Sequence, residues 1–377
     1  MDAQRTRTWA EISLSALRHN VKELMGVLPS GCALMGVVKA DAYGHGAVPV
    51  AAALRESGCQ YLAVACPEEA FALRQAGETL PILILGAVDA AFAPRLAEQG
   101  IAQAVECLDK GRALSAALAP GQTLKIHIKL DTGMGRLGFT VREETALAEA
   151  AAVTALPGLE TEGVFTHFAV SDTPGGEEYT REQFALFTAA ADELERRSGK
   201  KIPLRHCANS GAVLSFRQEG FALNMVRPGI LTYGIFPDKI DGGLSLVPEM
   251  SLKSRISAIT SHKKGDTISY GRTWTAERDC TLAVIPVGYA DGLQRALSGK
   301  LTVELRGRRA PQVGRICMDM CMLDVTDLPE TKVGDVVTVF GNGADGGPTA
   351  AELAELAGTI PYELTCGISL RVPRIYI

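Results

Sequence analysis

Eight short apolar runs, separated by stretches rich in alanine, leucine and glutamate, dominate residues 32–226 of this sequence. Helical patterns, such as residues 48–56, 68–76 and 182–197, lie between most of them. Continuous apolar strands that alternate with helices form parallel sheets, and eight such units suit a closed (β/α)8 barrel of the TIM type. Pattern alone leaves a doubly wound sheet open as the alternative. The apolar runs are residues 34–38, 61–65, 82–85, 103–106, 124–128, 163–166, 204–207 and 224–226.

The pattern changes near residue 236. Residues 236–248 are rich in turn-forming residues and are expected to connect two domains. Alternating β-branched segments follow at residues 253–260, 281–286, 301–305 and 333–340, and a further helix is expected at residues 349–357. The chain has 377 residues, which favours two domains over one core. We therefore predict a (β/α)8 barrel over residues 12–238 and a mainly β domain over residues 239–377, joined by an N-terminal strand within residues 1–11.

Composition narrows the function. The net charge is -5, so no basic field favours binding to nucleic acid, and a small-molecule partner is expected. The polar N-terminus does not resemble a signal peptide, and the most apolar run, residues 80–88, is too short to cross a membrane. The nine cysteines lack metal-binding spacing, and no H-E-x-x-H motif is present. We expect a reduced, cytoplasmic, metal-free protein.

The segment VVKADAYGHG, residues 37–46, places Lys39 at the carboxyl end of the first barrel strand. Chemistry in such barrels lies at the carboxyl ends of the strands. A lysine packed behind valines loses hydration, which favours its neutral amine, and a neutral amine can form a Schiff base. For a lone lysine, a surface position at a strand end is the simpler interpretation. Tyr43 adds a hydroxyl, and the Gly44-His45-Gly46 turn would let backbone approach a ligand.

Later strand ends add further polar groups. KLDTGMGRLG, residues 129–138, contains the G-x-G-x-x-G pattern of dinucleotide sites, but it follows the fifth strand and carries Arg136 inside the turn. His167 follows the sixth strand, the Ser210 turn the seventh, and Arg227 the eighth. Taken singly, His167 and Arg227 could be structural. A lysine amine, phosphate-binding turns and aromatic hydroxyls together indicate pyridoxal 5'-phosphate (PLP).

The sequence resembles the alanine racemase family of barrel-type PLP enzymes over essentially its whole length. The motifs that carry the resemblance are VVKADAYGHG, KLDTGMGRLG, FTHFA, CANSGA, MVRPGI, ISYGRTW, IPVGYADG, GRICMDM and PYELTCGIS. The resemblance implies a cytoplasmic isomerase that interconverts L-alanine and D-alanine by two-base proton transfer on a PLP external aldimine. It also implies a homodimer with shared active sites, and a supply of D-alanine for cell-wall peptidoglycan.

The resemblance also implies roles for individual residues. Lys39 would hold PLP and serve the D-enantiomer, whereas Tyr270 of a second subunit would serve the L-enantiomer. Arg227 would face the pyridine nitrogen, and His167 would hydrogen-bond toward Tyr270 and Arg227. The phosphate would be held by Tyr43, Ser210, Gly229, Ile230 and Tyr362. Arg136 and Met318 would bind substrate, with Lys129, which is often carbamylated in the family, Asp319, Tyr289 and Arg295 in support.

Proton chemistry agrees with this assignment. Racemisation removes a proton from one face of Cα and delivers one to the other, so two groups must lie on opposite faces. Arg227 cannot accept a proton, and its charge disfavours protonation of the pyridine nitrogen.

Three other functions share part of this pattern. A barrel-only PLP-binding protein would lack the β domain that carries Tyr270. A PLP decarboxylase of the same plan would place an acidic residue where Arg227 stands. A serine or broad-spectrum amino-acid racemase stays open, because one added hydroxyl changes the demands on a pocket only modestly.

Overall fold

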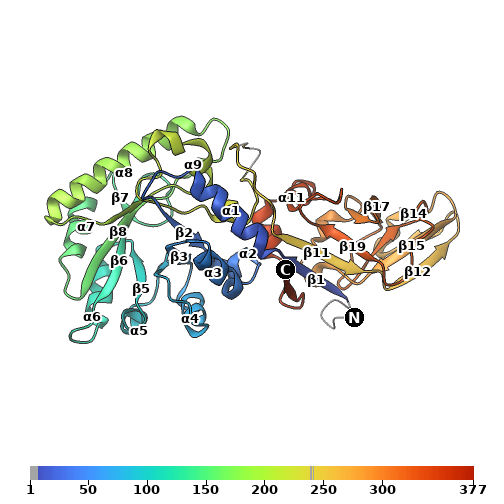
Figure 1. The fold of residues 1–377 in the computed structure, drawn as a ribbon, viewed down its shortest axis with the longest axis horizontal. Coiled ribbons are helices and arrows are strands. Elements are labelled where there is room, and N and C mark those ends of the chain that lie inside the picture. Colours follow the sequence, from blue (N-terminus) through green and yellow to red (C-terminus); the bar gives the residue numbers. More distant parts are fainter. Residues whose placement is uncertain (1–6, 238–239, 241) are drawn as a thin grey trace.

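The computed structural model describes residues 7–237, 240 and 242–377. Figure 1 shows an elongated molecule with a barrel at one end and a β-rich domain at the other. The predicted boundary between residues 238 and 239 lies outside the described residues, as do residues 1–6 of the predicted N-terminal strand.

Eight parallel strands form the barrel, and all eight predicted apolar runs contribute one strand each. The neighbours run β2-β3-β4-β5-β6-β8-β9-β10, and β10 pairs with β2 to close the ring. The prediction of a closed TIM-type barrel is therefore confirmed, and the doubly wound sheet is wrong. The strands are β2 (Ala33–Val37), β3 (Tyr61–Val64), β4 (Ile82–Ile84), β5 (Ile101–Val105), β6 (Leu124–Asp131), β8 (Leu159–Phe165), β9 (Leu204–His206) and β10 (Met225–Val226), with the short β7 (Phe139–Thr140) beside β6.

Helices surround the barrel because each carries one apolar face. In α8 the buried side chains recur at helical spacing, as at Phe187, Ala190, Ala191 and Leu194. The helices are α1 (Leu14–Gly26), α2 (Lys39–Tyr43), α3 (Ala47–Glu56), α4 (Pro67–Gln75), α5 (Ala93–Glu98), α6 (Leu108–Ala117), α7 (Ala146–Thr154), α8 (Glu177–Ser198), α9 (Ser210–Ser215) and α10 (Gly229–Thr232).

The second domain is built on another sheet, in the order β12-β15-β18-β17-β16-β19-β11-β1-β20. Figure 1 shows β1 leaving the barrel side to lie beside β11, with which it pairs antiparallel, and β20 pairs with β1 on its other side. The elements are β1 (Thr8–Ile12), β11 (Met250–Arg255), β12 (Ala258–His262), β15 (Cys280–Ile285), β16 (Thr302–Leu305), β17 (Arg308–Val313), β18 (Cys321–Asp324), β19 (Val336–Phe340), β20 (Arg374–Tyr376), the hairpin β13 (Thr267–Ile268) and β14 (Trp274–Thr275), and the helices α11 (Ala350–Ala357) and α12 (Pro361–Cys366).

One predicted β segment is wrong in detail, because residues 253–260 form parts of two strands. The chain changes partner between them: the Ile256 amide donates to the Asp335 carbonyl, whereas the Ser257 amide donates to the Val284 carbonyl. The alternation of apolar and polar residues does not show which strands pair, so it could not predict this change of partner.

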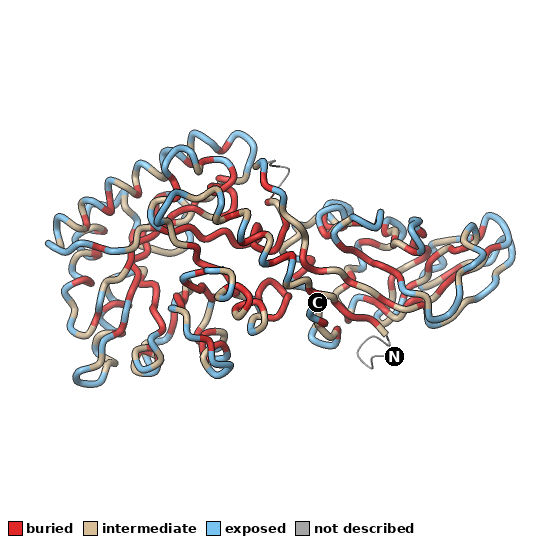
Figure 2. The backbone as a smooth tube through the Cα atoms, in the orientation of Figure 1, coloured by how far each residue is buried: buried red, intermediate tan, exposed pale blue. Residues whose placement is uncertain are grey.

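Buried residues run continuously from the barrel wall into the second domain (Figure 2). Ile230, Leu231 and Met250 belong to the same apolar cluster as Phe340 and Leu353. Among the described residues, no helix has the length and apolar character needed to cross a membrane, and no cluster of His, Cys, Asp or Glu is arranged to hold a metal ion.

Candidate active site

A cavity of about 590 Å³ lies where the barrel strands end. It brings together ten of the residues that the sequence singled out. They are Lys39, Tyr43, Lys129, Arg136, His167, Ser210, Arg227, Gly229, Ile230 and Tyr362.

Lys39 follows β2 and begins α2, whose turn is left-handed. Ala40, Asp41 and Ala42 have φ values of 53°, 52° and 54°, a conformation that costs energy in residues with a Cβ atom. The turn keeps both Lys39 and Tyr43 in the cavity wall. Burial lowers the pKa of the Lys39 amine, and the Arg136 guanidinium lowers it further. Both effects shift the equilibrium of this amine toward the neutral form that the sequence predicts.

The Gly44-His45-Gly46 turn has another role than the predicted one. A Cβ atom on Gly44 would overlap the Thr365 carbonyl, and one on Gly46 would overlap the Tyr376 hydroxyl. The glycines therefore let the backbone approach the C-terminal segment rather than a ligand. The Asp41 carboxylate accepts from the Ala47 amide at the start of α3, at 2.7 Å.

Asp131 shapes the turn that carries Arg136. Its Oδ1 accepts from the amides of Gly133 at 2.8 Å and Met134 at 2.9 Å, and its Oδ2 accepts from the Arg136 amide at 3.2 Å. Although burial alone would raise the pKa of Asp131, hydrogen bonds from Gly133 and Gly135 lower it. Sequence reasoning missed this residue. An aspartate directly before a glycine-rich turn is the signal that could have found it.

Lys129 lines the cavity and is almost fully buried. Its Nζ donates to the Leu130 carbonyl at 2.8 Å and lies 5.4 Å from the centre of the Phe165 ring. Burial, followed by the charge of Arg227, lowers the pKa of Lys129 to about 7. A large fraction of this amine is therefore neutral near physiological pH.

A chain of hydrogen bonds runs from Arg227 into the barrel interior, and we call it the relay. Arg227 Nη1 lies 2.7 Å from His206 Nδ1, His206 Nε2 lies 2.8 Å from His127 Nδ1, and His127 Nε2 lies 3.3 Å from Glu162 Oε2. A guanidinium only donates and a carboxylate only accepts. The two ends therefore fix both imidazoles as neutral tautomers with the proton on Nε2.

The relay ends at the opposite side of the barrel, near the starts of its strands. Glu162 also accepts from Lys125 Nζ at 2.6 Å and from the Tyr61 hydroxyl. Burial alone would raise the pKa of Glu162, but the hydrogen bonds from His127, Lys125 and Tyr61 lower it to about 2. Burial, followed by the charge of Arg227, holds the pKa of His206 well below its ordinary value.

Sequence reasoning missed the relay. The signal was a histidine inside an otherwise apolar predicted strand, as in Leu124-Lys-Ile-His-Ile128, and a glutamate, Glu162, directly before the predicted strand of residues 163–166. It also missed cavity-lining residues, namely Phe165, Asp172, Asn209, Leu137 and Cys366.

The remaining predicted residues do not meet this cavity. Tyr270, Met318 and Tyr289 lie on the second domain and are 71%, 53% and 44% exposed. Arg295 is also exposed, and Asp319 pairs with Arg371 at 2.8 Å. Within the described residues, one copy of the chain does not bring the two groups of predicted residues together.

Comparisons with known proteins cover almost the whole chain. Residues 12–237 match the family described as "Alanine racemase, N-terminal domain", and residues 249–376 match "Alanine racemase, C-terminal domain". The alanine racemase of Desulfovibrio desulfuricans is 47% identical over 98% of both chains, and alanine racemase 1 of Clostridium acetobutylicum is 44% identical over 98% of this chain and 95% of its own.

Solved structures are similar over the same span. The alanine racemase of Clostridium difficile has a TM-score of 0.93 and 39% identity, covering 99% of this chain and 96% of its own. The alanine racemase of Bacillus anthracis with bound L-Ala-P has a TM-score of 0.91 and 38% identity, covering 99% and 95%.

Proposed function

This chain belongs to the alanine racemase family of isomerases, and we propose that it interconverts L-alanine and D-alanine with PLP as its cofactor. The relatives and structural neighbours carry alanine in their names, so a serine or broad-spectrum racemase is not favoured. The observation that carries the proposal is one cavity that combines a desolvated lysine amine with the groups suited to an aromatic phosphate.

The residues in the cavity fit PLP. A Cβ atom on Gly229 would overlap the Tyr43 hydroxyl, so backbone and phenol already converge where a phosphate would be held. Ser210 and Ile230 line the same wall. We assign Tyr43, Ser210, Gly229, Ile230 and Tyr362 to the phosphate and Lys39 to the covalent link. When bound, PLP supplies an electron-withdrawing ring that acidifies the Cα–H bond of an attached amino acid.

Arg227 is assigned to the pyridine nitrogen. Burial lowers its pKa to about 10, so the guanidinium stays charged at neutral pH. The relay and the Thr166 carbonyl, which accepts from Nη2 at 2.8 Å, hold its plane in place. A fixed cation beside that nitrogen opposes its protonation. We assign His167, 3.4 Å from Arg227 Nη2, to the same polar group.

The two proton carriers are Lys39 on one face of Cα and Tyr270 on the other. Tyr270 is exposed and does not line the cavity of its own chain. A phenol so placed can act only if a second copy of the chain presents its cavity to it. We therefore propose a homodimer in which each active site combines the barrel of one copy with Tyr270 and Met318 of the other.

The supporting residues receive roles from the same proposal. Arg136 binds the substrate carboxylate, and a carbamate on Lys129 would orient it; the nearly neutral amine of Lys129 is the form that reacts with carbon dioxide. Tyr289, Arg295 and Asp319 border the access channel. We further propose domains of residues 12–238 and 239–377, a cytoplasmic location, and use of D-alanine in peptidoglycan, all from the family resemblance.

Mixed dimers test the shared site. Lys39→Ala and Tyr270→Phe homodimers are each expected to lose about 10²–10⁴-fold in kcat. After the two variants are unfolded and refolded together, each hybrid has one site that carries both Lys39 and Tyr270, and activity should return. A mixture that stays inactive, although hybrids are seen by native mass spectrometry, would reject the shared site. Borohydride treatment, followed by peptide mass analysis, should locate the cofactor on Lys39.

A further inference from the structure

Tyr270, Met318 and Tyr289 lie on three turns of the second domain that are tied to one another. The Ser269 hydroxyl donates to the Arg315 carbonyl at 2.8 Å, and the Tyr289 and Ala290 amides donate to the carbonyls of residues 317 and 318 at 3.1 Å and 3.0 Å. A Cβ atom on Gly288 would overlap both of those carbonyls. The three turns, residues 269–271, 288–291 and 315–320, therefore form one unit, which we call the platform.

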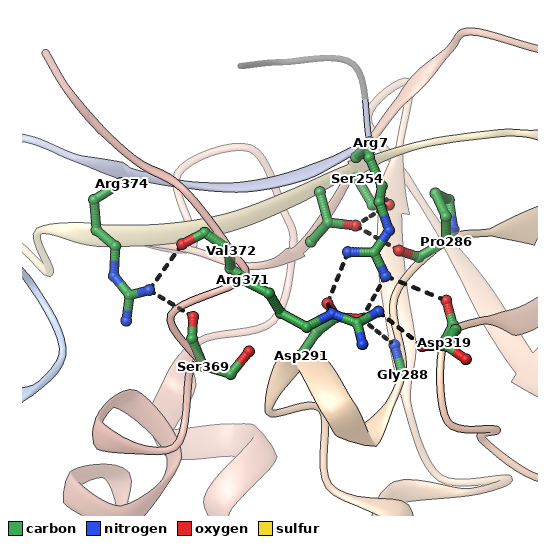
Figure 3. Close-up of polar contacts among 11 residues, drawn as sticks. Arg7, Ser254, Pro286, Gly288, Asp291, Asp319, Ser369, Arg371, Val372 and Arg374 are labelled. Carbon is green, nitrogen blue, oxygen red and sulfur yellow. Dashed lines mark hydrogen bonds and ion pairs between the residues drawn. The ribbon is translucent and has the colours of Figure 1, made fainter. Parts of the chain in front are cut away.

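The platform contains one buried carboxylate. The Asp291 side chain is 0% exposed and accepts from Arg7 Nη1 at 2.7 Å and Arg7 Nη2 at 2.8 Å. It also pairs with Arg371 Nε at 2.9 Å and accepts from the Gly288 amide at 2.9 Å. Figure 3 shows the two guanidinium groups converging on this carboxylate from different segments of the chain.

The same arginines reach the neighbouring turn. Arg371 Nη2 donates to Asp319 Oδ1 at 2.8 Å, and Arg7 Nη2 contacts the Asp319 carbonyl at 3.5 Å. Asp319 directly follows Met318, so the contacts clamp the 288–291 turn to the 315–320 turn. Arg374 donates to the Ser369 and Val372 carbonyls at 2.7 Å and 2.8 Å, which shapes the loop that carries Arg371 (Figure 3).

The two arginines of this clamp lie next to two strands that pair with each other. Arg7 directly precedes β1, and Arg371 lies just before β20, which pairs with β1. The platform is thereby fixed to the sheet, not to the barrel cavity of its own chain. Exposed side chains such as Tyr270 and Met318 have little packing to hold them, so their positions depend on the backbone beneath them. A misplacement of about 1 Å in a reacting group costs about 10²-fold in rate.

We propose that Asp291, Arg7 and Arg371 are positioning residues of the reaction: they hold the platform in the conformation that presents Tyr270 and Met318 to the cavity of a second copy. This inference rests on the proposed function, and it adds the residues that make the second domain rigid enough to serve a site on another molecule.

The chain offers a matched control. Arg55 pairs with Glu78 at 2.7 Å and Arg371 with Asp291 at 2.9 Å; the side chains are 37% and 4% exposed in the first pair and 42% and 0% in the second. The Glu78 carboxylate also accepts from two backbone amides, and neither residue lines the cavity. Arg371→Ala and Arg55→Ala are therefore expected to lower the thermal midpoint by similar amounts. Only Arg371→Ala should lower kcat/KM for alanine, by about 10- to 100-fold.

A hybrid dimer tests whether Arg371→Ala lowers activity through the platform or through the cavity of its own chain. In a hybrid of an Arg371→Ala chain with a Lys39→Ala chain, the single cavity with Lys39 faces an intact platform. Its kcat/KM per functional site should equal that of a hybrid of wild-type and Lys39→Ala chains. If it stays as low as in the Arg371→Ala homodimer, or if Arg55→Ala is equally impaired, the proposal is wrong.

A second variant is needed in case the first does not fold, and a separate comparison distinguishes failure of this inference from failure of the proposed function. If Arg371→Ala does not fold, Arg7→Ala removes the bidentate partner of Asp291 and enters the same experiments with the same expected and contrary results. Failure of the proposed function would instead appear as wild-type protein without racemase activity, or as no recovery in mixtures of Lys39→Ala and Tyr270→Phe.

Discussion

The predicted site residues of the barrel line a cavity, whereas those of the second domain lie on an exposed surface. Lys39, Lys129 and His167 line one cavity, where burial displaces their pKa values. Tyr270 and Met318 are exposed on the platform. The barrel builds its chemical environment within one chain, whereas in the proposed dimer the groups of the second domain would receive theirs from the cavity of another copy.

Both regions hold their key groups with a guanidinium and a carboxylate, but in different ways. In the barrel, Arg227 and Glu162 lie at opposite ends of the relay and are joined by two neutral histidines. In the second domain, Arg7 and Arg371 contact Asp291 directly. The barrel network spans an interior, and the platform network clamps exposed turns. Substitutions in the barrel should therefore change stability more than substitutions on the platform surface.

The largest effect is expected for Arg227→Leu. The change leaves His206 Nδ1 and the Thr166 carbonyl buried without their donor. Unmade hydrogen bonds of this kind should lower the free energy of unfolding by about 2–4 kcal/mol, measured by urea denaturation. Arg181→Leu, which breaks an exposed bidentate pair with Glu219, should cost less than about 1 kcal/mol. If the two substitutions lower the free energy of unfolding equally, the buried relay contributes no more to stability than the exposed pair does.

Glu162→Gln should have a smaller, pH-dependent effect. The pKa of Glu162 falls from an ordinary 4.5 to about 2 on folding, so its ionised form stabilises the protein fully above pH 4.5. That stabilisation is lost as the pH falls toward 2. The stability difference between wild type and Glu162→Gln, followed by urea unfolding, should therefore narrow over this window. Glu193 is a partly exposed carboxylate that pairs with the exposed Arg196, so 0.5 M salt should remove most of any stability difference between wild type and Glu193→Gln.

Lys129→Met should stabilise the protein in buffer depleted of carbon dioxide. The pKa of Lys129 falls from 10.5 to about 7 on folding, so below pH 10.5 the unfolded chain binds the proton more tightly. This penalty grows as the pH falls to about 7 and is constant below it. The gain in thermal midpoint should reach its full size at about pH 7, stay constant below that pH, and vanish toward pH 10.5. Lys263→Met, at an exposed ion pair, should show no such gain, and a gain independent of pH at Lys129 would contradict the argument.

The smallest change in stability is expected for Met318→Ala. Because this side chain is 53% exposed, the free energy of unfolding should change by less than about 0.5 kcal/mol, while KM for alanine rises. Met35→Ala, at a fully buried position of β2, should cost about 2–5 kcal/mol. If both substitutions destabilise the protein equally, Met318 is packed, and the contrast between the two regions fails.

Much of the barrel could be predicted because a short apolar run in the sequence identifies each barrel strand. A run of apolar residues such as Ile82–Ile84 identifies a buried parallel strand without knowledge of its neighbours. The second domain was harder. Strand β17 begins with Arg308 and Arg309, and the four residues of β18 end with Asp324, so neither stands out as an apolar run. The change of partner after Ile256 depends on Asp335 and Val284, which lie farther along the chain.

The candidate site also contains residues that local sequence patterns reveal and residues that they do not. Lys39, Arg136 and Arg227 could be found because they follow strands, and strand ends meet at one edge of a barrel. The relay and the Asp291 clamp could not be found as networks, since their members are separated by up to 284 residues and no local pattern links them. The Gly44 to Gly46 turn was misjudged for a related reason: its neighbours are Thr365 and Tyr376, near the other end of the chain.

The position of β1 has a consequence for biosynthesis. This strand ends at residue 12, but its partner β11 begins at residue 250, after the entire barrel. At translation rates of about 5–20 residues per second, the strand waits roughly 10–50 s for its first partner to leave the ribosome. During that interval a nascent chain carries an unpaired edge, and the barrel can close before the sheet that anchors its first residues exists. Slow or paused translation should therefore lengthen the period in which this protein is vulnerable to aggregation.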